Sequence, residues 1–317
     1  HFHFWWAMKR RRNPFGSPAA KRKFPFRSAL SDGVTDEAIN NFAVNVAGML
    51  RTFEKLNVNQ LSVFSTSDIT DYIFCKVAGV LPEATKLSRL IAVQGKLTIE
   101  STTPLFRALR VSPHLIYLDL RSTNLSESII SDLVDTLPFS RLQTLNIAKN
   151  RSDLLPFVNL AHPCLWLHEL YLDENYISST ESVFEAIMSN LPNLKILSLV
   201  DCALSGEDLC RLTPLVIQHS NLSALHLCCN PLGEKGIEEV SQIAIHSVSL
   251  QEMHLIGIHF TEESSQKLVN AIADRKFAAL KVSPSQLAQR ALYLRKLYPG
   301  KLEMDTFLTK HKLDAYK

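Results

Sequence analysis

The stretch LSALHLCCNPL, residues 222–232, places four leucines and an asparagine at set positions in a phrase of eleven residues. The same phrase reads LIYLDLRSTNL at residues 115–125 and LHELYLDENYI at residues 167–177. Its general form is L-x-x-L-x-L-x-x-(N/C/T)-x-L, and nine copies begin at residues 58, 87, 115, 142, 167, 194, 222, 250 and 277, in steps of 25 to 29 residues. So regular a period predicts a chain built from stacked structural repeats.

Each copy predicts a strand followed by a helix. The alternation of Leu225 and Leu227 with other residues has the period of a β-strand. Amphipathic segments of roughly three helical turns follow the later copies, at residues 178–190, 205–218, 234–246 and 261–273. A repeated strand–helix order predicts parallel strands. Because one unit alone would expose its leucines, and burying each Leu or Ile contributes about 1.5–3 kcal/mol, we expect the units to fold only when stacked.

The period near 28 residues and the mix of Asn and Cys at the ninth place of the phrase resemble the leucine-rich repeat of the ribonuclease-inhibitor type over residues 58–287. The resemblance implies an α/β solenoid that is curved, with parallel strands on the concave face, mostly helices on the convex face and about nine repeats. It implies binding through the concave face but no particular partner. We expect the ninth side chain to satisfy backbone groups where each strand bends away. The ninth residues are Thr66, Gly95, Thr123, Asn150, Asn175, Cys202, Asn230, Ile258 and Ser285.

The helix starts and one short repeat carry local expectations. Ser178 and Glu181 have the spacing of a capping box, and Ser205 is followed by acids that the helix dipole favours at the first turn. The unit from residue 142 to residue 167 is short and contains Pro156 and Pro163, so we expect it to lack a regular helix.

Four segments follow from the pattern: a basic, flexible tail at 1–30, an N-terminal capping helix at 31–57, the solenoid at 58–287 and a C-terminal cap at 288–317. The tail holds eight Lys or Arg residues and no acid. Removing these eight from the chain's 34 basic residues leaves 26 against 31 acidic residues, so the rest of the chain carries a net charge of about −5. The basic clusters are Lys9, Arg10, Arg11 and Arg12, then Lys21, Arg22 and Lys23.

The tail supports three alternative roles. Its two clusters have the spacing of a bipartite nuclear localisation signal, which a nuclear import receptor would bind. Its phenylalanines, Phe15, Phe24 and Phe26, would suit stacking on RNA bases while the basic residues contact phosphates. The third alternative is a disordered arm. We expect an intracellular protein, cytoplasmic or nuclear, with a mitochondrial location left open.

The cysteines indicate the compartment, and the lengths of the apolar runs indicate whether the chain spans a membrane. Six cysteines show no spacing typical of a disulfide framework, which favours a reducing compartment. No apolar run reaches the roughly 18 residues of a membrane span. We therefore predict a chain without a membrane span.

The residues between the leucines should point to the concave face and line up in rows from strand to strand. Near the middle of the repeats they combine aromatic side chains with charges, which favours a partner-binding patch because aromatic and Arg side chains dominate interface energetics. The predicted patch consists of Tyr117, Asp119, Arg121, His168, Glu169, Tyr171, Asp173 and Glu174.

A metal site is not expected, although one set of side chains could hold Zn²⁺. His226 and Cys228 lie on the same face of one predicted strand, and His254 should lie beside His226 on the next. No fourth ligand is evident from the sequence, and exposed histidines on a sheet are common.

The sequence favours a non-enzymatic scaffold or adaptor that binds a partner protein and needs no cofactor. It contains no Gly-rich phosphate loop and no nucleophile elbow. One alternative is a peripheral subunit of a large ribonucleoprotein or organellar assembly with an RNA-contacting tail. A less favoured one is a GTPase activator of the RanGAP kind, in which Arg121 or Asn146 would act on a partner's active site.

Overall fold

A computed structural model describes residues 60–64, 69–93, 95–258, 261–273 and 279–282. The chain divides into two compact units, residues 1–150 and residues 151–317, and each is described by itself. The predicted tail at 1–30, the capping helix at 31–57 and the C-terminal cap at 288–317 lie outside the described residues. Among the residues described, no helix is long and apolar enough to cross a membrane.

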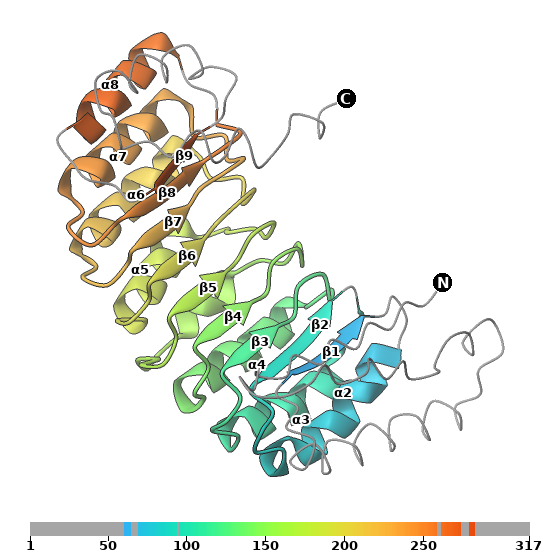
Figure 1. The fold of residues 1–317 in the computed structure, drawn as a ribbon. Helices are drawn as coiled ribbons and strands as arrows, with labels where there is room; N and C mark the ends of the chain where they lie inside the picture. Colours follow the sequence, from blue (N-terminus) through green and yellow to red (C-terminus); the bar gives the residue numbers. More distant parts are fainter. Residues whose placement is uncertain (1–59, 65–68, 94, 259–260, 274–278, 283–317) are drawn as a thin grey trace, which may run out of the picture. The chain divides into compact units, whose positions relative to one another are not determined.

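In unit 1 the described residues alternate strand and helix, and Figure 1 shows the helices on one face of the strands. Adjacent strands pair in parallel. The strands are β1 (Gln60–Phe64), β2 (Arg89–Val93), β3 (Tyr117–Asp119) and β4 (Thr144–Asn146). The helices are α2 (Ile69–Val80), α3 (Ile99–Arg110) and α4 (Glu127–Thr136), with short 3-10 turns at Leu81–Glu83 and Leu137–Phe139.

Unit 2 repeats the same order, again with its helices on one face of the strands (Figure 1). Its strands also pair in parallel. They are β5 (Glu169–Tyr171), β6 (Ile196–Ser198), β7 (Ala224–His226), β8 (Glu252–Leu255) and β9 (Ala279–Val282). The helices are α5 (Thr180–Asn190), α6 (Gly206–Gln218), α7 (Gly233–His246) and α8 (Glu262–Ala273), preceded by a 3-10 turn, η3 (Leu155–Asn159). The predicted α/β leucine-rich repeat solenoid is confirmed.

The strands pair without slippage, so equivalent places of the phrase lie side by side. Leu118 pairs with Leu145 in unit 1, and Leu197 pairs with Leu225 in unit 2. The places between the leucines form rows, as predicted. In unit 1 the row is Ser62, Ile91, Asp119 and Asn146, and in unit 2 it is Tyr171, Ser198, His226, His254 and Lys281.

The core of each unit lies between its strands and helices. Leu118, Leu170 and Leu225, the fourth residues of their phrases, are completely buried. Phenylalanines from the helical side fill the space between the layers, such as Phe106 in unit 1 and Phe184 in unit 2. Because each strand is only three to five residues long, this stacked burial holds the repeats together.

Where the ninth residue of the phrase is asparagine, its side chain bonds the backbone where the strand ends, as predicted. The side-chain oxygen of Asn230 accepts hydrogen bonds from the backbone N–H of Cys202 and of Leu204, both at 3.0 Å. Its amide nitrogen donates to the carbonyls of Leu199 and Leu227, at 2.7 and 2.9 Å. Asn150 makes the equivalent bonds in unit 1. Each such asparagine therefore joins two consecutive repeats through buried hydrogen bonds.

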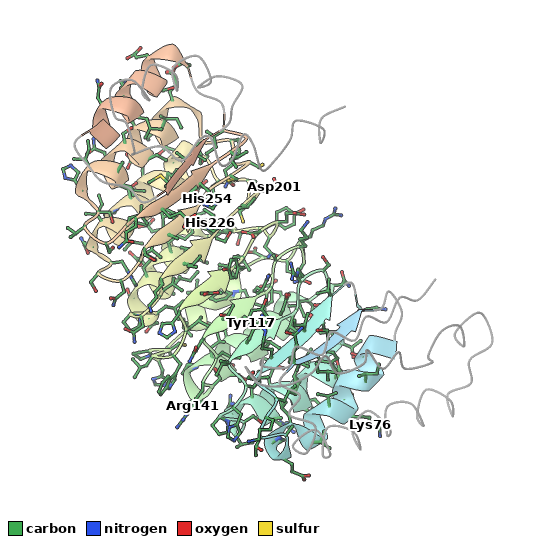
Figure 2. All side chains as sticks on the ribbon, in the orientation of Figure 1. Lys76, Tyr117, Arg141, Asp201, His226 and His254 are labelled. Carbon is green, nitrogen blue, oxygen red and sulfur yellow. The ribbon has the colours of Figure 1, made fainter. Side chains whose placement is uncertain are left out.

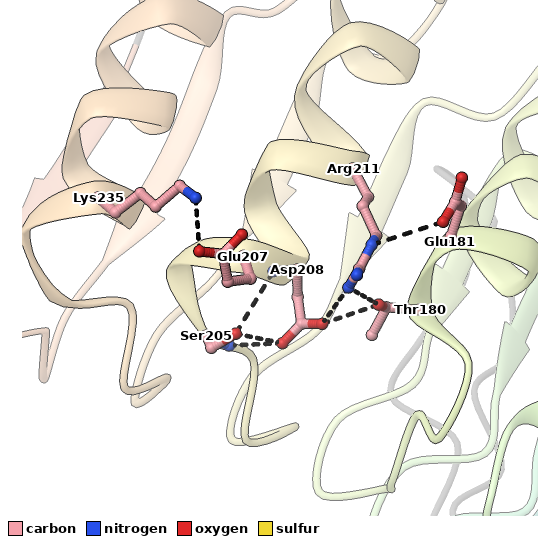
Figure 3. Close-up of polar contacts among 7 residues, drawn as sticks. All are labelled: Thr180, Glu181, Ser205, Glu207, Asp208, Arg211 and Lys235. Carbon is pink, nitrogen blue, oxygen red and sulfur yellow. Dashed lines mark hydrogen bonds and ion pairs between the residues drawn. The ribbon is translucent and has the colours of Figure 1, made fainter.

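The start of α6 confirms the expected dipole arrangement and adds a capping box (Figure 3). The Ser205 hydroxyl accepts from the Asp208 backbone N–H, and the Asp208 carboxylate accepts from the Ser205 N–H at 2.8 Å. The Asp208 carboxylate also accepts from the Thr180 hydroxyl at 2.7 Å, so the start of α6 is bonded to the start of α5.

The capping box predicted at Ser178 and Glu181 is wrong. Helix α5 begins at Thr180, its N-cap residue is Ser179, and no side chain caps it. The Ser178 N–H instead donates to Asp153 at 3.2 Å, which holds residue 178 in the loop before the helix. The start of α5 is instead joined to the neighbouring repeat by the side-chain hydrogen bond from Thr180 to Asp208.

The short repeat lacks a regular helix, as its prolines predicted. Between residue 151 and β5 the structure has only η3, with Pro156 in its first turn. Phe157 is fully buried there, so the segment still covers the core.

Candidate protein-binding face

We call the sheet surface opposite the helices the open face. In each unit the helices cover the other surface, so the side chains between the leucines are left on this one (Figure 1). The eight predicted patch residues divide between the units. Tyr117, Asp119 and Arg121 belong to unit 1, and His168, Glu169, Tyr171, Asp173 and Glu174 belong to unit 2.

In unit 1 the three predicted residues form a cluster, and a further residue, Arg89, belongs to it. The guanidinium of Arg89 lies 3.5 Å from the centre of the Tyr117 ring, a cation–π contact. Arg121 donates to the Asp119 carboxylate at 2.7 Å, and its backbone N–H donates to the same group at 3.2 Å. The Tyr117 hydroxyl lies 3.5 Å from that carboxylate. One acid thus positions a tyrosine and an arginine.

Asp119 does not meet the prediction that it offers a charge to a partner. Its side chain is completely buried, whereas that of Arg121 is 44% exposed. Burial raises the pKa of Asp119, although hydrogen bonds from Arg121 and the charge of Arg121 oppose the rise. Burial, and then the charge of Asp119, raise the pKa of Tyr117, so the phenol stays protonated and able to donate at neutral pH. We therefore assign Asp119 a positioning role.

In unit 2 the predicted residues form two pairs of contacts. The Tyr171 hydroxyl donates to Glu169 at 3.3 Å, and both side chains are half-buried on β5. The Asp173 carboxylate accepts from the Ser198 hydroxyl at 2.5 Å and from the Val200 backbone N–H at 2.9 Å. Asp173 therefore fastens the end of β5 to β6, which is a structural role.

The remaining two predicted residues flank β5. The His168 backbone carbonyl accepts from the backbone N–H groups of Lys195 and Ile196 at 2.7 and 3.0 Å. The side chain of His168 is half-buried. Glu174 lies just past the strand with a left-handed backbone, φ 53°. Of the residues predicted for the patch in unit 2, those that keep exposed surface without a structural role are thus Tyr171, Glu169, His168 and Glu174.

Three further residues of unit 2 form a separate cluster on the open face, which we call the histidine cluster: His226, Glu252 and His254. The rings of His226 and His254 are stacked, with centroids 4.0 Å apart and planes inclined by 1° (Figure 2). Glu252 accepts a hydrogen bond from Nε2 of His254. The sequence offered Cys228 beside these histidines as an unfavoured third ligand, but Cys228 is buried and its sulfur accepts the Ile256 N–H at 3.3 Å.

Two residues of the open face were missed by the sequence reasoning. Arg89 occupies the same place of its phrase as Tyr117, with which it pairs across β2 and β3. Glu252 stands two residues before His254, and side chains two apart on a strand share a face. The signal was present in both cases, because Arg89 and Glu252 occupy the same place of the phrase as the predicted Tyr117 and Glu169, but in repeats outside the predicted patch.

Asn146 and the cysteines bear on the less favoured hypotheses of catalysis. Asn146, the alternative GTPase-activating residue, is half-buried and accepts the Ala148 N–H at 3.0 Å, a local turn contact. The six cysteines all lie within the described residues and are free thiols. Burial raises the pKa of Cys164 and of Cys202 to about 12, so neither is a nucleophile at neutral pH.

Comparison with known proteins adds relatives that share the repeat. No family model matches the chain. It is 27% identical over 202 residues to NLR family CARD domain-containing protein 4 of Xenopus tropicalis, covering 62% of this chain and 20% of that protein. It is 22% identical to protein NLRC5 of Ictalurus punctatus over 62% of this chain and 12% of that protein. It is 25% identical to NACHT, LRR and PYD domains-containing protein 14 of Homo sapiens, over 51% of this chain and 16% of that protein.

The chain thus spans between 12% and 20% of the length of these curated relatives. A solved structure of an internalin from Listeria monocytogenes matches 69% of this chain and 67% of its own at 19% identity, with a TM-score of 0.38, a value too low to carry a conclusion. The repeat period, the paired strands with their buried leucines and the similarity to NLR proteins agree: the chain is a leucine-rich repeat protein.

Proposed function

We propose that the chain is a non-enzymatic protein-interaction scaffold or adaptor whose partner binds the open face. One observation carries the proposal: in both units the open face presents a tyrosine that is held in place by a neighbouring acid. Tyr117 lies next to Asp119 in unit 1, and Tyr171 donates to Glu169 in unit 2. A tyrosine fixed before binding loses little conformational entropy on binding, which favours it as an interface anchor.

The charges around each tyrosine suit the rim of an interface. Arg89 and Arg121 surround Tyr117, and both keep exposed surface. Glu169 and Glu174 lie near Tyr171 in the sequence of unit 2 and are half-buried. Partly exposed charges of this kind set partner choice and association rate more than affinity. The proposal requires no reaction and no cofactor. We also propose that the repeats are of the ribonuclease-inhibitor type.

Affinity purification with paired variants tests the proposal. Replacing Tyr171→Ala together with Glu169→Ala should remove the partner that the unaltered protein captures, because the anchor and the acid that holds it are both lost. Loss of one well-packed aromatic anchor costs about 2–4 kcal/mol of binding energy, or roughly 30-fold or more in affinity. The captured proteins are compared by quantitative mass spectrometry.

The matched control is Tyr176→Ala. Tyr176 is 56% exposed in the same unit, but it pairs with Asp153 in the loop after β5 and is not on the strand. This variant should retain the partner. Circular dichroism and thermal unfolding verify that each variant is folded. A partner retained by the folded double variant, or lost equally from the control, contradicts the assignment of the open face.

A further inference from the structure

We propose that the histidine cluster, His226, Glu252 and His254, is a binding site for a divalent transition-metal ion, with Zn²⁺ as the best fit. The site goes beyond the proposed partner binding and is tested with the metal alone. Its residues come from two adjacent strands, because β7 and β8 pair in parallel with His226 opposite His254. Glu252 is two residues before His254 and so shares its face.

The three side chains already bring their ligand atoms together. One ring nitrogen from each histidine and one carboxylate oxygen of Glu252 all lie within 4.8 Å of one another. The side chain of His254 is 17% exposed and that of Glu252 is 34% exposed. The cluster is therefore shielded on most sides yet open enough for an ion to enter and for a fourth ligand, such as water, to complete a tetrahedron.

Binding requires only a small rearrangement. Metal–ligand bonds of about 2.0–2.1 Å in a tetrahedron place neighbouring ligand atoms about 3.4 Å apart. The ligand atoms farthest apart must therefore approach by at most about 1.4 Å, and the hydrogen-bonded atoms of His254 and Glu252 must move slightly apart. The two rings are now parallel, at 1°, and one ring must turn so that both nitrogen lone pairs point to the same ion. The torsion that turns an imidazole ring is broad and costs little.

The donor set selects the class of ion. Two imidazole nitrogens and one carboxylate oxygen suit zinc and its neighbours in the first transition row, whereas calcium and magnesium prefer oxygen ligands alone. Glu252 now accepts a hydrogen bond from His254, so its carboxylate would pass from this proton to the ion. An ion at this point would contact two imidazoles and one carboxylate together, from two neighbouring strands.

Titration calorimetry with Zn²⁺ on the full chain tests the site. The chain has eleven histidines, so the result is the difference between the unaltered protein and its variants, not total uptake. We expect the unaltered protein to bind one equivalent of Zn²⁺ at this site. The affinity for that equivalent should fall in His226→Ala, in His254→Ala and in Glu252→Gln. Each substitution should lower the affinity for Zn²⁺ by more than the roughly 10–100-fold that follows removal of an outer-shell partner, because these residues contact the ion itself. The control His246→Ala alters an exposed histidine at the end of α7 and should leave binding unchanged.

Cobalt absorption gives a second, independent measurement. Co²⁺ in the site should show visible bands of tetrahedral intensity without the near-ultraviolet band of a thiolate ligand. A thiolate band would place Cys228 or Cys229 in the ligand set and overturn the assignment. Zinc binding that all three folded variants retain, or that the unaltered protein lacks, would also overturn it. Circular dichroism on each variant separates loss of the site from loss of the fold.

Discussion

A residue with left-handed backbone conformation follows the strand in six of the repeats. The eighth residue has φ between 52° and 77° in six consecutive repeats: Ser122, Lys149, Glu174, Asp201, Cys229 and Gly257. A residue other than glycine loses about 1–2 kcal/mol in this conformation. The loss is offset because the N–H there reaches the next repeat: Asp201 donates to the Cys228 carbonyl and Cys229 to the Ile256 carbonyl, at 2.9 and 2.8 Å.

Glycine occupies only one of these eighth places, Gly257, which also has the largest φ. A Cβ atom on Gly257 would lie 2.9 Å from the sulfur of Cys229, closer than atoms approach without a shift. At the other eighth places a side chain is tolerated because the hydrogen bonds above fix the turn. The strain therefore recurs with the repeat and marks the architecture, not a functional site.

Replacing Asn230→Ala tests how much the ninth residue contributes. The change leaves the buried N–H groups of Cys202 and Leu204 without their acceptor, and each unsatisfied buried group costs about 1–3 kcal/mol. We expect the free energy of unfolding in denaturant to fall by about 3 kcal/mol or more. The control Asn221→Ala removes an exposed amide that donates to the Pro192 carbonyl, and it should cost less than about 1 kcal/mol. Equal losses in the two variants would contradict the role given to Asn230.

At the scale of elements, the starts of helices α6 and α7 meet at two glycines. A Cβ on Gly206 would meet the backbone nitrogen of Gly236 at 2.7 Å, and a Cβ on Gly236 would lie 3.3 Å from the Cα of Gly206. No periodicity of apolar residues could have predicted this contact, because glycine contributes no side chain to the pattern. It shows only once the two helices are stacked in three dimensions.

The strands and helices themselves could be predicted because their apolar side chains form a pattern in the sequence. Buried leucines recur with the repeat, and each strand can bury them only in register with its neighbours, so the rows on the open face follow from the spacing. The caps were harder: Ser178 and Ser205 have similar local patterns, and which of them caps a helix depends on Asp153 and Thr180 in other repeats. Likewise the burial of Asp119 depends on how Arg121 and Tyr117 fold over it, which spacing alone does not determine.

The capping box of α6 predicts a pH-dependent stability. Burial alone would raise the pKa of Asp208, but hydrogen bonds from Ser205 and Thr180 outweigh it, and the pKa is lowered. An acid whose pKa falls on folding contributes fully above its unfolded pKa, near 3.9, and loses that contribution as the pH drops through the folded pKa. Asp208→Asn should therefore cost about 1 kcal/mol at pH 7, and the stabilities of the two proteins should converge as the pH drops through the lowered pKa of Asp208.

The control for this measurement is Glu207→Gln in the same turn. Glu207 forms only an exposed ion pair with Lys235, whose removal should change stability by less than about 1 kcal/mol at any pH. The measurement is thermal unfolding of the three proteins across the pH range. A penalty for Asp208→Asn that stays constant into acid would show that the carboxylate charge is not what stabilises the helix start.

At the scale of the whole molecule, the charge separates a basic end from an acidic remainder. Residues 1–30 carry eight basic side chains and no acid, while the rest of the chain has a net charge of −5 from 26 basic and 31 acidic residues. A partner held by the open face uses anchors such as Tyr171, together with acids of that remainder. A partner held by the basic end would depend on ionic strength instead, since contacts with phosphates release counterions.

Deleting residues 1–30 distinguishes these two modes of binding. We expect the truncated chain to keep every partner that the Tyr171→Ala and Glu169→Ala variant loses, because the open face is untouched. RNA, if bound through the tail, should be released with a slope of log affinity against log salt no steeper than about −6, since eight charges contact a single strand. The measurement combines affinity purification of both proteins with RNA titrations at several salt concentrations. RNA binding that survives the deletion would assign the contact to the repeats, and loss of the open-face partner on deletion would mean that the tail completes its binding site.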